Sequence, residues 1–224
     1  MINKQIVKIC CQSCINAYPD KKTVAVIHPG ASFVQGHVEG HFGFLDETLV
    51  IVFRGSDGKK DWIDNLKIWK KDIRKTRPYS GARPDIKVHQ GFIEQYKTIR
   101  KVIRQIVESY PNQKEIIITG HSLGGALATL SAVDIKYNYP EKSVLCITFG
   151  SPRVGNKAFT RSFIKRVPRS FRFVCGDDLV CKVPMPVLGF KHISNKIQLG
   201  RKRWYKYFTG SSKDHDLEEY LKYL

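Results

Sequence analysis

The fold is decided by the stretch Ile116-Ile117-Ile118-Thr119-Gly120-His121-Ser122-Leu123-Gly124-Gly125-Ala126-Leu127-Ala128-Thr129. A β-branched apolar run ends in Gly-His-Ser-Leu-Gly, and a helical pattern of small residues follows, which predicts a strand, a sharp turn and a helix. A turn this tight would place Ser122 in a strained backbone conformation with its hydroxyl exposed. Glycine is expected at positions 120 and 124, because a side chain there would crowd the turn. The N–H groups at the start of the helix would favour negative charge beside the serine.

The composition is that of a globular chain. Its 224 residues predict a single domain, residues 1–224, which is long enough to bury a full core. Hydrophobic residues make up 42% of the sequence and aromatic residues 11%, which argues against disorder. No apolar run reaches the length that a membrane-spanning helix needs.

The N-terminal segment predicts an amphipathic helix. Met1 to Ala17 is apolar in character, but Lys8 interrupts it. The uninterrupted apolar part is short for a signal peptide, so we expect an intracellular protein.

Cysteine usage is consistent with that expectation. The six cysteines are Cys10, Cys11, Cys14, Cys146, Cys175 and Cys181. The first three form a cluster that could bind a metal or oxidise, but no second Cys or His pair with zinc spacing accompanies it. Reduced thiols of an intracellular protein are therefore favoured, and neither a metal site nor another cofactor is predicted.

The formal net charge is +18. Such a charge suits an anionic partner, which could be a membrane surface, an acidic substrate or nucleic acid. A lysine-rich solvated surface with no such partner is an equally good explanation.

Strand and helix patterns alternate along most of the chain. Thr48 to Phe53 and Val144 to Phe149 are almost wholly apolar, as in strands buried on both faces. Phe92 to Tyr110 has apolar residues every three or four positions, which predicts a helix that Pro111 ends. This alternation predicts an α/β fold with a central, mostly parallel sheet flanked by helices. In such sheets, active sites and ligand-binding sites lie at the carboxyl ends of the strands.

Other segments have weaker patterns. We predict strands at Thr23 to Ile27 and Phe171 to Cys175, hairpins at Ser32 to Phe44 and Phe190 to Phe208, helices at Asp57 to Trp69, Ala158 to Arg166 and Asp216 to Leu224, and a surface loop at Lys70 to Asp85.

A serine hydroxyl needs a base within hydrogen-bond reach, and the base needs an orienting carboxylate. In α/β-hydrolases the chain order is serine, then acid, then histidine. Asp177 and Asp178 both follow Ser122, at the end of a predicted strand. Of the two later histidines, His192 falls within a predicted hairpin strand, whereas His215 lies in a loop from which it can reach the serine. His215 is therefore the favoured base.

Several motifs together make the chain resemble the fungal-type class 3 lipases, a branch of the α/β-hydrolases. The matching pieces, in the order of that family, are Val52-Phe53-Arg54-Gly55-Ser56, Asp61-Trp62-Ile63-Asp64-Asn65-Leu66, Val88-His89-Gln90-Gly91-Phe92, Gly120 to Ala126, Thr148 to Gly155, and Asp178-Leu179-Val180 with Val183-Pro184. They cover most of the chain from about Thr48 onward. The N-terminal part, Met1 to Glu47, matches the family only weakly.

The resemblance assigns roles to individual residues. It implies Ser122 as nucleophile, His215 as general base and Asp178 as its orienting acid, since the family's acid directly precedes an apolar residue and Val. It places Ser56 and the backbone N–H of Leu123 in the oxyanion hole. One departure is Cys181, which stands where the family commonly has Pro.

The resemblance also implies a lid, and Asp57 to Trp69 is its counterpart here. Trp62, Ile63 and Leu66 recur at helical spacing and would form its apolar, substrate-binding side. A helix that packs these side chains into the core is the alternative interpretation.

The implied function is that of a serine hydrolase cleaving carboxylic esters of lipids, such as triacylglycerol or other acylglycerols. Phospholipase A1 activity and small-ester carboxylesterase activity are alternatives on the same fold. A non-catalytic basic protein that binds lipid or nucleic acid is the rival outside the enzymes. The intact serine, aspartate and histidine argue against it, and no nucleic-acid-binding motif accompanies the charge. The expected partners are a lipid or ester substrate and an anionic membrane surface.

Overall fold

The structure is a computed structural model of the chain. It describes residues 2–21, 23–24, 26–56, 70–72, 85–193, 195–202 and 211–224.

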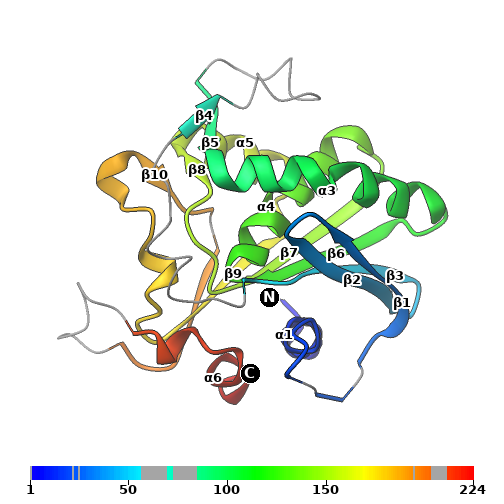
Figure 1. Cartoon of the computed structure of the whole chain (residues 1–224), viewed down its shortest axis with the longest axis horizontal. Coiled ribbons are helices and arrows are strands. Elements are labelled where there is room, and N and C mark those ends of the chain that lie inside the picture. Colours follow the sequence, from blue (N-terminus) through cyan, green and yellow to red (C-terminus); the bar gives the residue numbers. More distant parts are fainter. Residues whose placement is uncertain are drawn as a thin grey trace.

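A seven-stranded sheet forms the centre of the molecule (Figure 1). In spatial order its strands are β1 (His28–Gln35), β2 (Val38–Leu45), β3 (Thr48–Phe53), β6 (Glu115–His121), β7 (Ser143–Phe149), β9 (Ser170–Cys175) and β11 (Lys196–Leu199). The first three strands pair antiparallel, and every pairing from β3 to β11 is parallel. The predicted mostly parallel sheet is confirmed.

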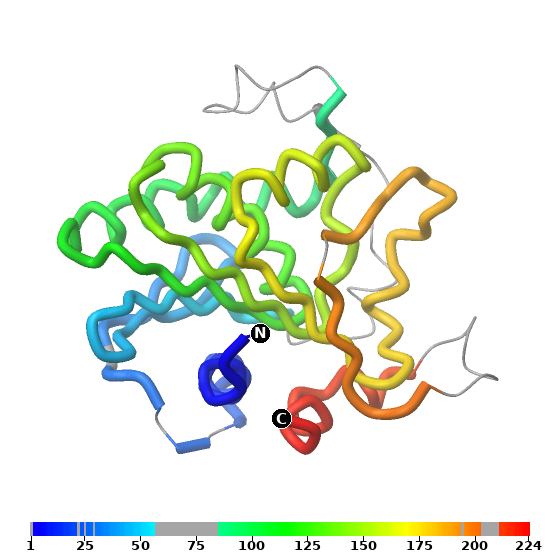
Figure 2. The backbone as a smooth tube through the Cα atoms, turned by 180° about the vertical axis from the view of Figure 1, so that it is seen from behind, coloured from blue at the N-terminus to red at the C-terminus, as the bar shows by residue number. Residues whose placement is uncertain are grey.

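Helices cover both faces of this sheet. The helices α3 (Gln90–Ser109), α4 (Leu123–Asn138) and α5 (Lys157–Arg166) lie on one face. The helices α1 (Lys4–Asn16) and α6 (Leu217–Lys222) lie together on the other face, so the two chain termini are close in space (Figure 2). Each face has its own cluster of buried apolar residues. Within the described residues, no helix combines the length and the hydropathy needed to cross a membrane.

A second, smaller sheet lies beside the first. Its order is β10 (Phe190–Lys191), β8 (Gly155–Asn156), β5 (Lys87–His89) and β4 (Lys70–Asp72), with antiparallel pairings throughout. The short strand β4 corrects the predicted surface loop, which was expected to begin at Lys70.

One predicted element is wrong, and another is tested only in part. None of the described residues of the expected strand Thr23 to Ile27 lies in a strand, and strand β1 instead begins at His28 and includes Pro29 and Gly30. Edge strands tolerate proline because one side of the strand forms no sheet hydrogen bonds, and the register shifts between Pro29 and Ala31. The predicted hairpin Phe190 to Phe208, broken at Gly200, has most of its second arm outside the described residues, and the strands of its first arm, β10 and β11, pair with β8 and β9.

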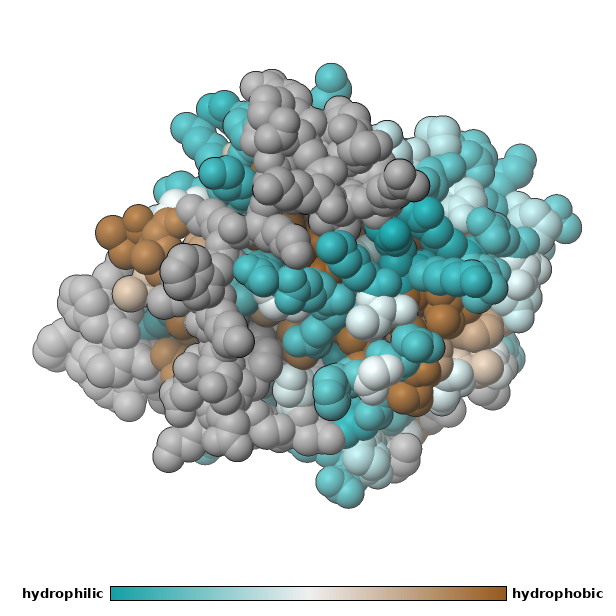
Figure 3. Space-filling view, turned by 45° about the horizontal axis from the view of Figure 1, so that its top comes forward, coloured by the Kyte–Doolittle hydropathy of each residue, from teal (hydrophilic) through white to brown (hydrophobic). Residues whose placement is uncertain are grey.

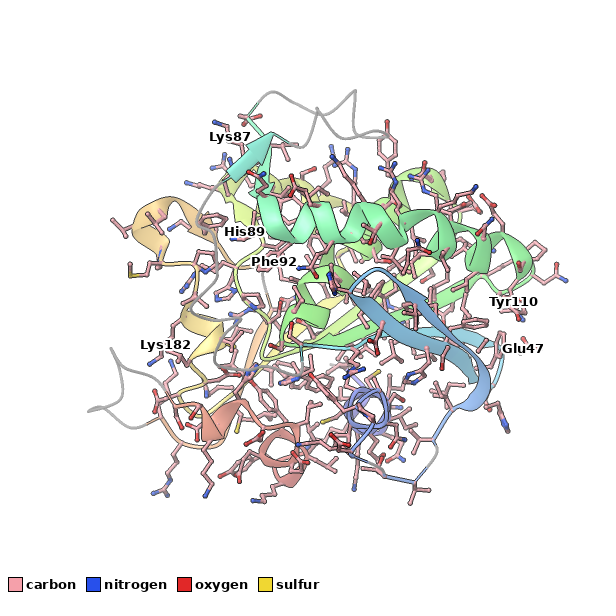
Figure 4. The ribbon with its side chains drawn as sticks, viewed as in Figure 1. Glu47, Lys87, His89, Phe92, Tyr110 and Lys182 are labelled. Atoms are coloured by element: carbon pink, nitrogen blue, oxygen red, sulfur yellow. The ribbon has the colours of Figure 1, made fainter. Side chains whose placement is uncertain are left out.

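Helix α3 is anchored to α4 by a buried carboxylate. Asp134 is fully buried, accepts a hydrogen bond from the Tyr96 hydroxyl at 2.8 Å and pairs with the Arg104 guanidinium at 2.7 Å. At the end of the same helix, Tyr110 packs on Phe44 of β2 with 4.9 Å between ring centroids, far from His89 at the helix start (Figure 4). These contacts fix the helix layer that supports the turn after β6.

Candidate active site

The turn between β6 and α4 has the strained geometry that its sequence predicts. Ser122 has φ 58° and ψ −126°, which a non-glycine residue rarely adopts. A Cβ atom at Gly120 would lie 2.3 Å from the carbonyl oxygen of Gly124, and one at Gly124 would lie 2.2 Å from that of Phe53. Glycine at both positions is therefore a steric requirement of this turn.

Ser122 is largely buried, and only 5% of the residue is accessible to solvent. The segment after β3 lies against it, since a Cβ atom at Gly55 would lie 3.1 Å from the Cβ of Ser122. The exposed fraction is that of the whole residue, so the exposure of the hydroxyl itself stays a prediction.

Asp178 and His215 form a buried pair. Strand β9 ends at Cys175, and Asp178 follows after a turn. His215 lies in a 3₁₀ turn, Lys213–His215, just before α6. Its Nδ1 is 2.9 and 3.0 Å from the two carboxylate oxygens of Asp178, and the two residues are only 2% and 1% exposed. The carboxylate holds the ring proton on Nδ1, which leaves the lone pair on Nε2 for a proton transfer.

Further contacts fix the Asp178 carboxylate. Its Oδ1 accepts a hydrogen bond from the backbone N–H of Val180 at 2.8 Å, and its Oδ2 accepts one from the hydroxyl of Tyr220. Burial, and then the adjacent carboxylate, raise the pKa of Tyr220 well above its usual value, so this hydroxyl remains a donor. The neighbouring Asp177 lies 3.9 Å from the Lys182 ammonium instead. The structure thus brings Asp178, not Asp177, to His215.

His121 joins the base to the N-terminal segment. Its Nε2 is 2.8 Å from the backbone oxygen of His215 and its Nδ1 is 2.9 Å from the Tyr18 hydroxyl. A carbonyl only accepts hydrogen bonds, so Nε2 donates and Nδ1 accepts from Tyr18. The His121 and His215 rings also pack with 4.4 Å between centroids. Because His121 directly precedes Ser122, these contacts place the base beside the strained turn.

The two predicted oxyanion donors lie at the same edge of the sheet. Leu123 is the first residue of α4, so its N–H is one of those that a helix leaves without an internal partner. Ser56 follows β3, on the segment that passes over Ser122. Arg54 fixes this segment through an ion pair with Glu39, and its guanidinium lies 5.7 Å from the centre of the Tyr18 ring.

Two other histidines lie away from the predicted acid and base. His192 is between β10 and β11 and donates its Nε2 proton to the Cys181 carbonyl at 2.8 Å. His89 precedes α3 and packs on Phe92 at 4.3 Å, which fits a structural role (Figure 4). The predicted lid residues Trp62, Ile63 and Leu66 lie outside the described residues.

Three residues around the site were missed by the sequence analysis. His121 of β6 contacts His215, Tyr220 of α6 contacts Asp178, and Tyr18, just after α1, contacts His121. Only His121 had a local signal, because it stands next to the serine. The contacts of Tyr18 and Tyr220 depend on how α1 and α6 pack on the sheet, and the sequence gives no spacing from which to infer them.

The cysteine cluster on α1 faces the core. Burial raises the pKa of Cys14 to about 12, and the thiols of Cys10 and Cys11 are shifted upward as well, chiefly by burial. Protonated, buried thiols are poor nucleophiles and poor metal ligands. Among the described residues, no group of three or more His, Cys, Asp or Glu side chains is arranged to hold a metal ion.

The comparison with known families agrees with this geometry. The model of the family described as lipase (class 3) matches residues 50–188. This chain belongs to the class 3 lipase family. The match runs from β3 through Ser122 and Asp178 to the turn before β10.

Individual relatives of this class 3 lipase were also found. "Phospholipase A(1) DAD1, chloroplastic" from Arabidopsis thaliana is 34% identical over 153 residues, which cover 62% of this chain and 34% of that protein. A lipase from Rhizomucor miehei is 33% identical over 157 residues, covering 67% and 41%. A lipase from Rhizopus oryzae is 31% identical over 190 residues, covering 81% and 46%. The matches thus span about a third to a half of the length of these curated relatives.

Solved structures confirm the fold of this class 3 lipase. The triacylglyceride lipase of Rhizomucor miehei superposes with a TM-score of 0.78 at 22% identity, covering 96% of this chain and 94% of that one. Lipase II from Rhizopus niveus gives 0.75 at 23% identity with the same coverage. The predicted α/β-hydrolase fold is therefore confirmed.

Proposed function

We propose that the protein hydrolyses carboxylic esters of lipids, with Ser122 as nucleophile, His215 as general base and Asp178 as its orienting acid. The observation that carries the proposal is the buried Asp178–His215 pair at 2.9 Å, held by His121 beside the strained Ser122 turn. A related lipase is described as having a serine protease triad as its catalytic centre, which supports the same roles here.

Acyl transfer follows from this arrangement. Ser122 attacks the ester carbonyl while Nε2 of His215 takes its hydroxyl proton, and Asp178 stabilises the imidazolium that forms. The N–H groups of Ser56 and Leu123 stabilise the tetrahedral oxyanion, at about 3 kcal/mol for each donor in comparable enzymes. His215 then protonates the leaving alcohol. Water activated by the same histidine releases the acid from Ser122.

The test is hydrolysis of a chain-length series of soluble and micellar esters by wild type and Ser122→Ala. Loss of the serine is expected to reduce turnover on the order of a millionfold. Ser131→Ala is a matched control, since Ser131 is a buried serine further along α4, and its activity should equal that of wild type. Equal activity of Ser122→Ala and wild type would overturn the proposal.

Acylglycerols are the proposed substrates. Fungal relatives are named secreted mono- and diacylglycerol lipases, whereas the Arabidopsis relative is named a phospholipase A(1). Parallel assays with diacylglycerol and phosphatidylcholine in mixed micelles distinguish these activities. Faster release of fatty acid from the phospholipid would make phospholipase A1 the correct function, and activity confined to short soluble esters would indicate a carboxylesterase.

We also propose that the protein acts at anionic lipid surfaces. The net charge of +18 supports attraction to such surfaces. On the face seen in Figure 3, many of the coloured residues are hydrophilic. The 5% exposure of Ser122 supports activation at an interface, because a substrate needs more access than this structure allows. Activity on vesicles should rise with their anionic lipid content at low salt. Indifference to lipid charge would contradict the proposal.

A further inference from the structure

A cavity of about 400 Å³ lies behind the Asp178 carboxylate. The cationic side chains that line it are Arg153, Arg172, Lys182, Lys196 and Lys202. They come from separate parts of the chain. Figure 4 labels one of them, Lys182, on the segment between β9 and β10. The cavity size falls within the range of about 300–1,000 Å³ typical of small-ligand sites.

Arg172 forms the buried floor of this cavity. It lies on β9, where it pairs with Thr148 of β7 and with Lys196 of β11. The residue is only 6% exposed, and its Nε has no hydrogen-bond partner among the described residues. Burial lowers the pKa of Arg172, although the Cys181 thiol, to which it is hydrogen-bonded, and the more distant Asp178 carboxylate act in the opposite direction. No ion pair of Arg172 is formed within the same residues. A buried guanidinium with an unpaired Nε is costly, and an anion in the cavity would supply its partner.

The two carboxylates in the wall do not balance the five cationic groups. Asp178 is held by His215, Tyr220 and the N–H of Val180, and Asp177 pairs with Lys182. The positive charges of Arg153, Arg172, Lys196 and Lys202 therefore remain in excess.

The pKa values of neighbouring groups reflect this excess of positive charge. Burial, and then the charge of Arg172, lower the pKa of Arg153. Partial burial and the adjacent Lys202 lower the pKa of Lys196 to about 8. Burial and the two arginines lower the pKa of His192 well below its usual value, so this ring adds no charge of its own. Repulsion among these groups would be relieved by a bound anion.

We propose that this cavity binds a phosphate-type anion, either free phosphate or a phosphate monoester. A guanidinium group suits a tetrahedral oxyanion because it can donate parallel hydrogen bonds to two of its oxygens. Nη1 of Arg153 already donates to the backbone oxygens of Lys182 and Pro184, so Arg153 would use its Nε and Nη2 groups. The exposed side chains of Lys196 and Lys202 form the rim, and Arg172 forms the floor. A substituent on the phosphate would point through this rim to solvent.

Calorimetric titration of inorganic phosphate into Ser122→Ala protein tests the site without any turnover. At pH 7 and constant ionic strength we expect saturable binding with one phosphate per chain and no comparable heat from chloride. Because Arg172→Gln could fail to fold, the main variant is the rim double substitution Lys196→Gln with Lys202→Gln. It should weaken phosphate binding at least about tenfold, as expected for loss of charge-assisted hydrogen bonds.

Lys191→Gln is the matched control, since Lys191 is exposed on β10 and does not line the cavity. It should leave phosphate binding unchanged. Absence of saturable binding would overturn the proposal, and so would equal weakening in Lys191→Gln and the rim variant, which would indicate general attraction to a basic surface.

Two further binding experiments distinguish a soluble phosphate ligand from a lipid headgroup. Glycerol phosphate represents soluble monoesters, and vesicles containing phosphatidic acid represent lipid headgroups. Displacement of inorganic phosphate by glycerol phosphate supports a soluble ligand. Binding of the vesicles that depends on Lys196 and Lys202, without glycerol phosphate binding, supports a lipid headgroup. Failure of both to compete would contradict the phosphate monoester part of the proposal.

Discussion

At the scale of single residues, the proposed acid and base are held by groups outside the triad. The Tyr220 hydroxyl and the Val180 N–H both donate to Asp178, and the Nε2 proton of His121 is donated to the backbone of His215. These groups restrict how the carboxylate and the imidazole can rotate. Positioning of this kind can account for a large part of a rate enhancement.

Tyr220→Phe tests this positioning. The change removes one donor from Asp178 and keeps the ring in the core. The value of kcat should fall about tenfold to a hundredfold with little change in KM, because a hydrogen bond to a charged group contributes about 1.5–3 kcal/mol. Steady-state kinetics on a micellar ester measure the effect. The pH profile of kcat should shift as well, since a looser Asp178 changes the basicity of His215.

Tyr223→Phe is the control, because Tyr223 is 55% exposed at the end of α6. Equal losses of activity in the two variants would argue against a positioning role for Tyr220.

The sequence could predict Ser122, Asp178 and His215 as candidates but not the residues that hold them. Ser122 lies in a local motif with steric rules of its own, and the order of the other two follows from the fold. Tyr18 lies 103 residues before its partner His121, and Tyr220 lies 42 residues after Asp178. Such contacts depend on the packing of helices, and no local pattern encodes that packing.

At the scale of elements, the turn between β6 and α4 is possible only because glycines let three backbone segments approach. The backbones at Gly120, Gly124 and the end of β3 lie so close together that a methyl group does not fit between them. The sequence predicted glycine at both positions for the turn alone, which is the reason at Gly120, whereas at Gly124 the closest contact comes from the end of β3.

Gly120→Ala should therefore lower the free energy of unfolding by at least about 2 kcal/mol, because the new methyl group would meet the Gly124 carbonyl. Urea unfolding measures this change. Gly91→Ala in α3 is the control, since its Cβ would meet only the His89 ring at 3.3 Å. Its effect should stay within about 1 kcal/mol, and a loss as large as that of Gly120→Ala would contradict the steric explanation.

The contact between α3 and α4 gives a second prediction at this scale. Arg104→Met leaves the fully buried Asp134 without its cationic partner, which should destabilise the protein by about 3–5 kcal/mol. Lys101→Met, an exposed change on the same helix, should stay within about 0.5 kcal/mol in the same urea titration. A small loss in Arg104→Met would show that water replaces the guanidinium.

At the scale of the whole molecule, the order of the parallel strands was more predictable than the edges of the sheet. Strands β3, β6 and β7 are apolar on both faces, so their sequence alone marks them as central. Strand β11 is short, with two polar residues among its four, and β1 contains Pro29. Their partners depend on the rest of the sheet, which explains why the sequence predicted neither the start of β1 nor the parallel pairing of β11.

The buried thiols in the core should make the protein less stable at alkaline pH. Burial raises the pKa of Cys146 to about 12, whereas an unfolded thiol ionises near 9. The native state therefore keeps this proton up to a higher pH than the unfolded state does. The contribution of the protonated thiol to the free energy of unfolding is complete below about pH 9 and falls as the pH rises above that value. Between pH 8 and pH 10 this effect should lower the free energy of unfolding by about 1.4 kcal/mol.

Cys146→Ala isolates this effect. The difference in unfolding free energy between wild type and Cys146→Ala should shrink by about 1.4 kcal/mol from pH 8 to pH 10 in urea titrations. Other titrating groups contribute equally to both proteins and cancel. A difference that stays constant with pH would contradict the raised pKa.

The contacts of His121 and Asp178 have a consequence for biosynthesis. Asp178 meets its histidine and Tyr220 only through residues 215 to 220, near the end of this sequence. A nascent chain that stops before residue 215 can complete the Ser122 turn but has no base beside it. Under the proposed mechanism, ester hydrolysis would begin only once helix α6 has left the ribosome and docked beside α1. A nascent chain that has not yet reached this helix would be unable to attack lipids.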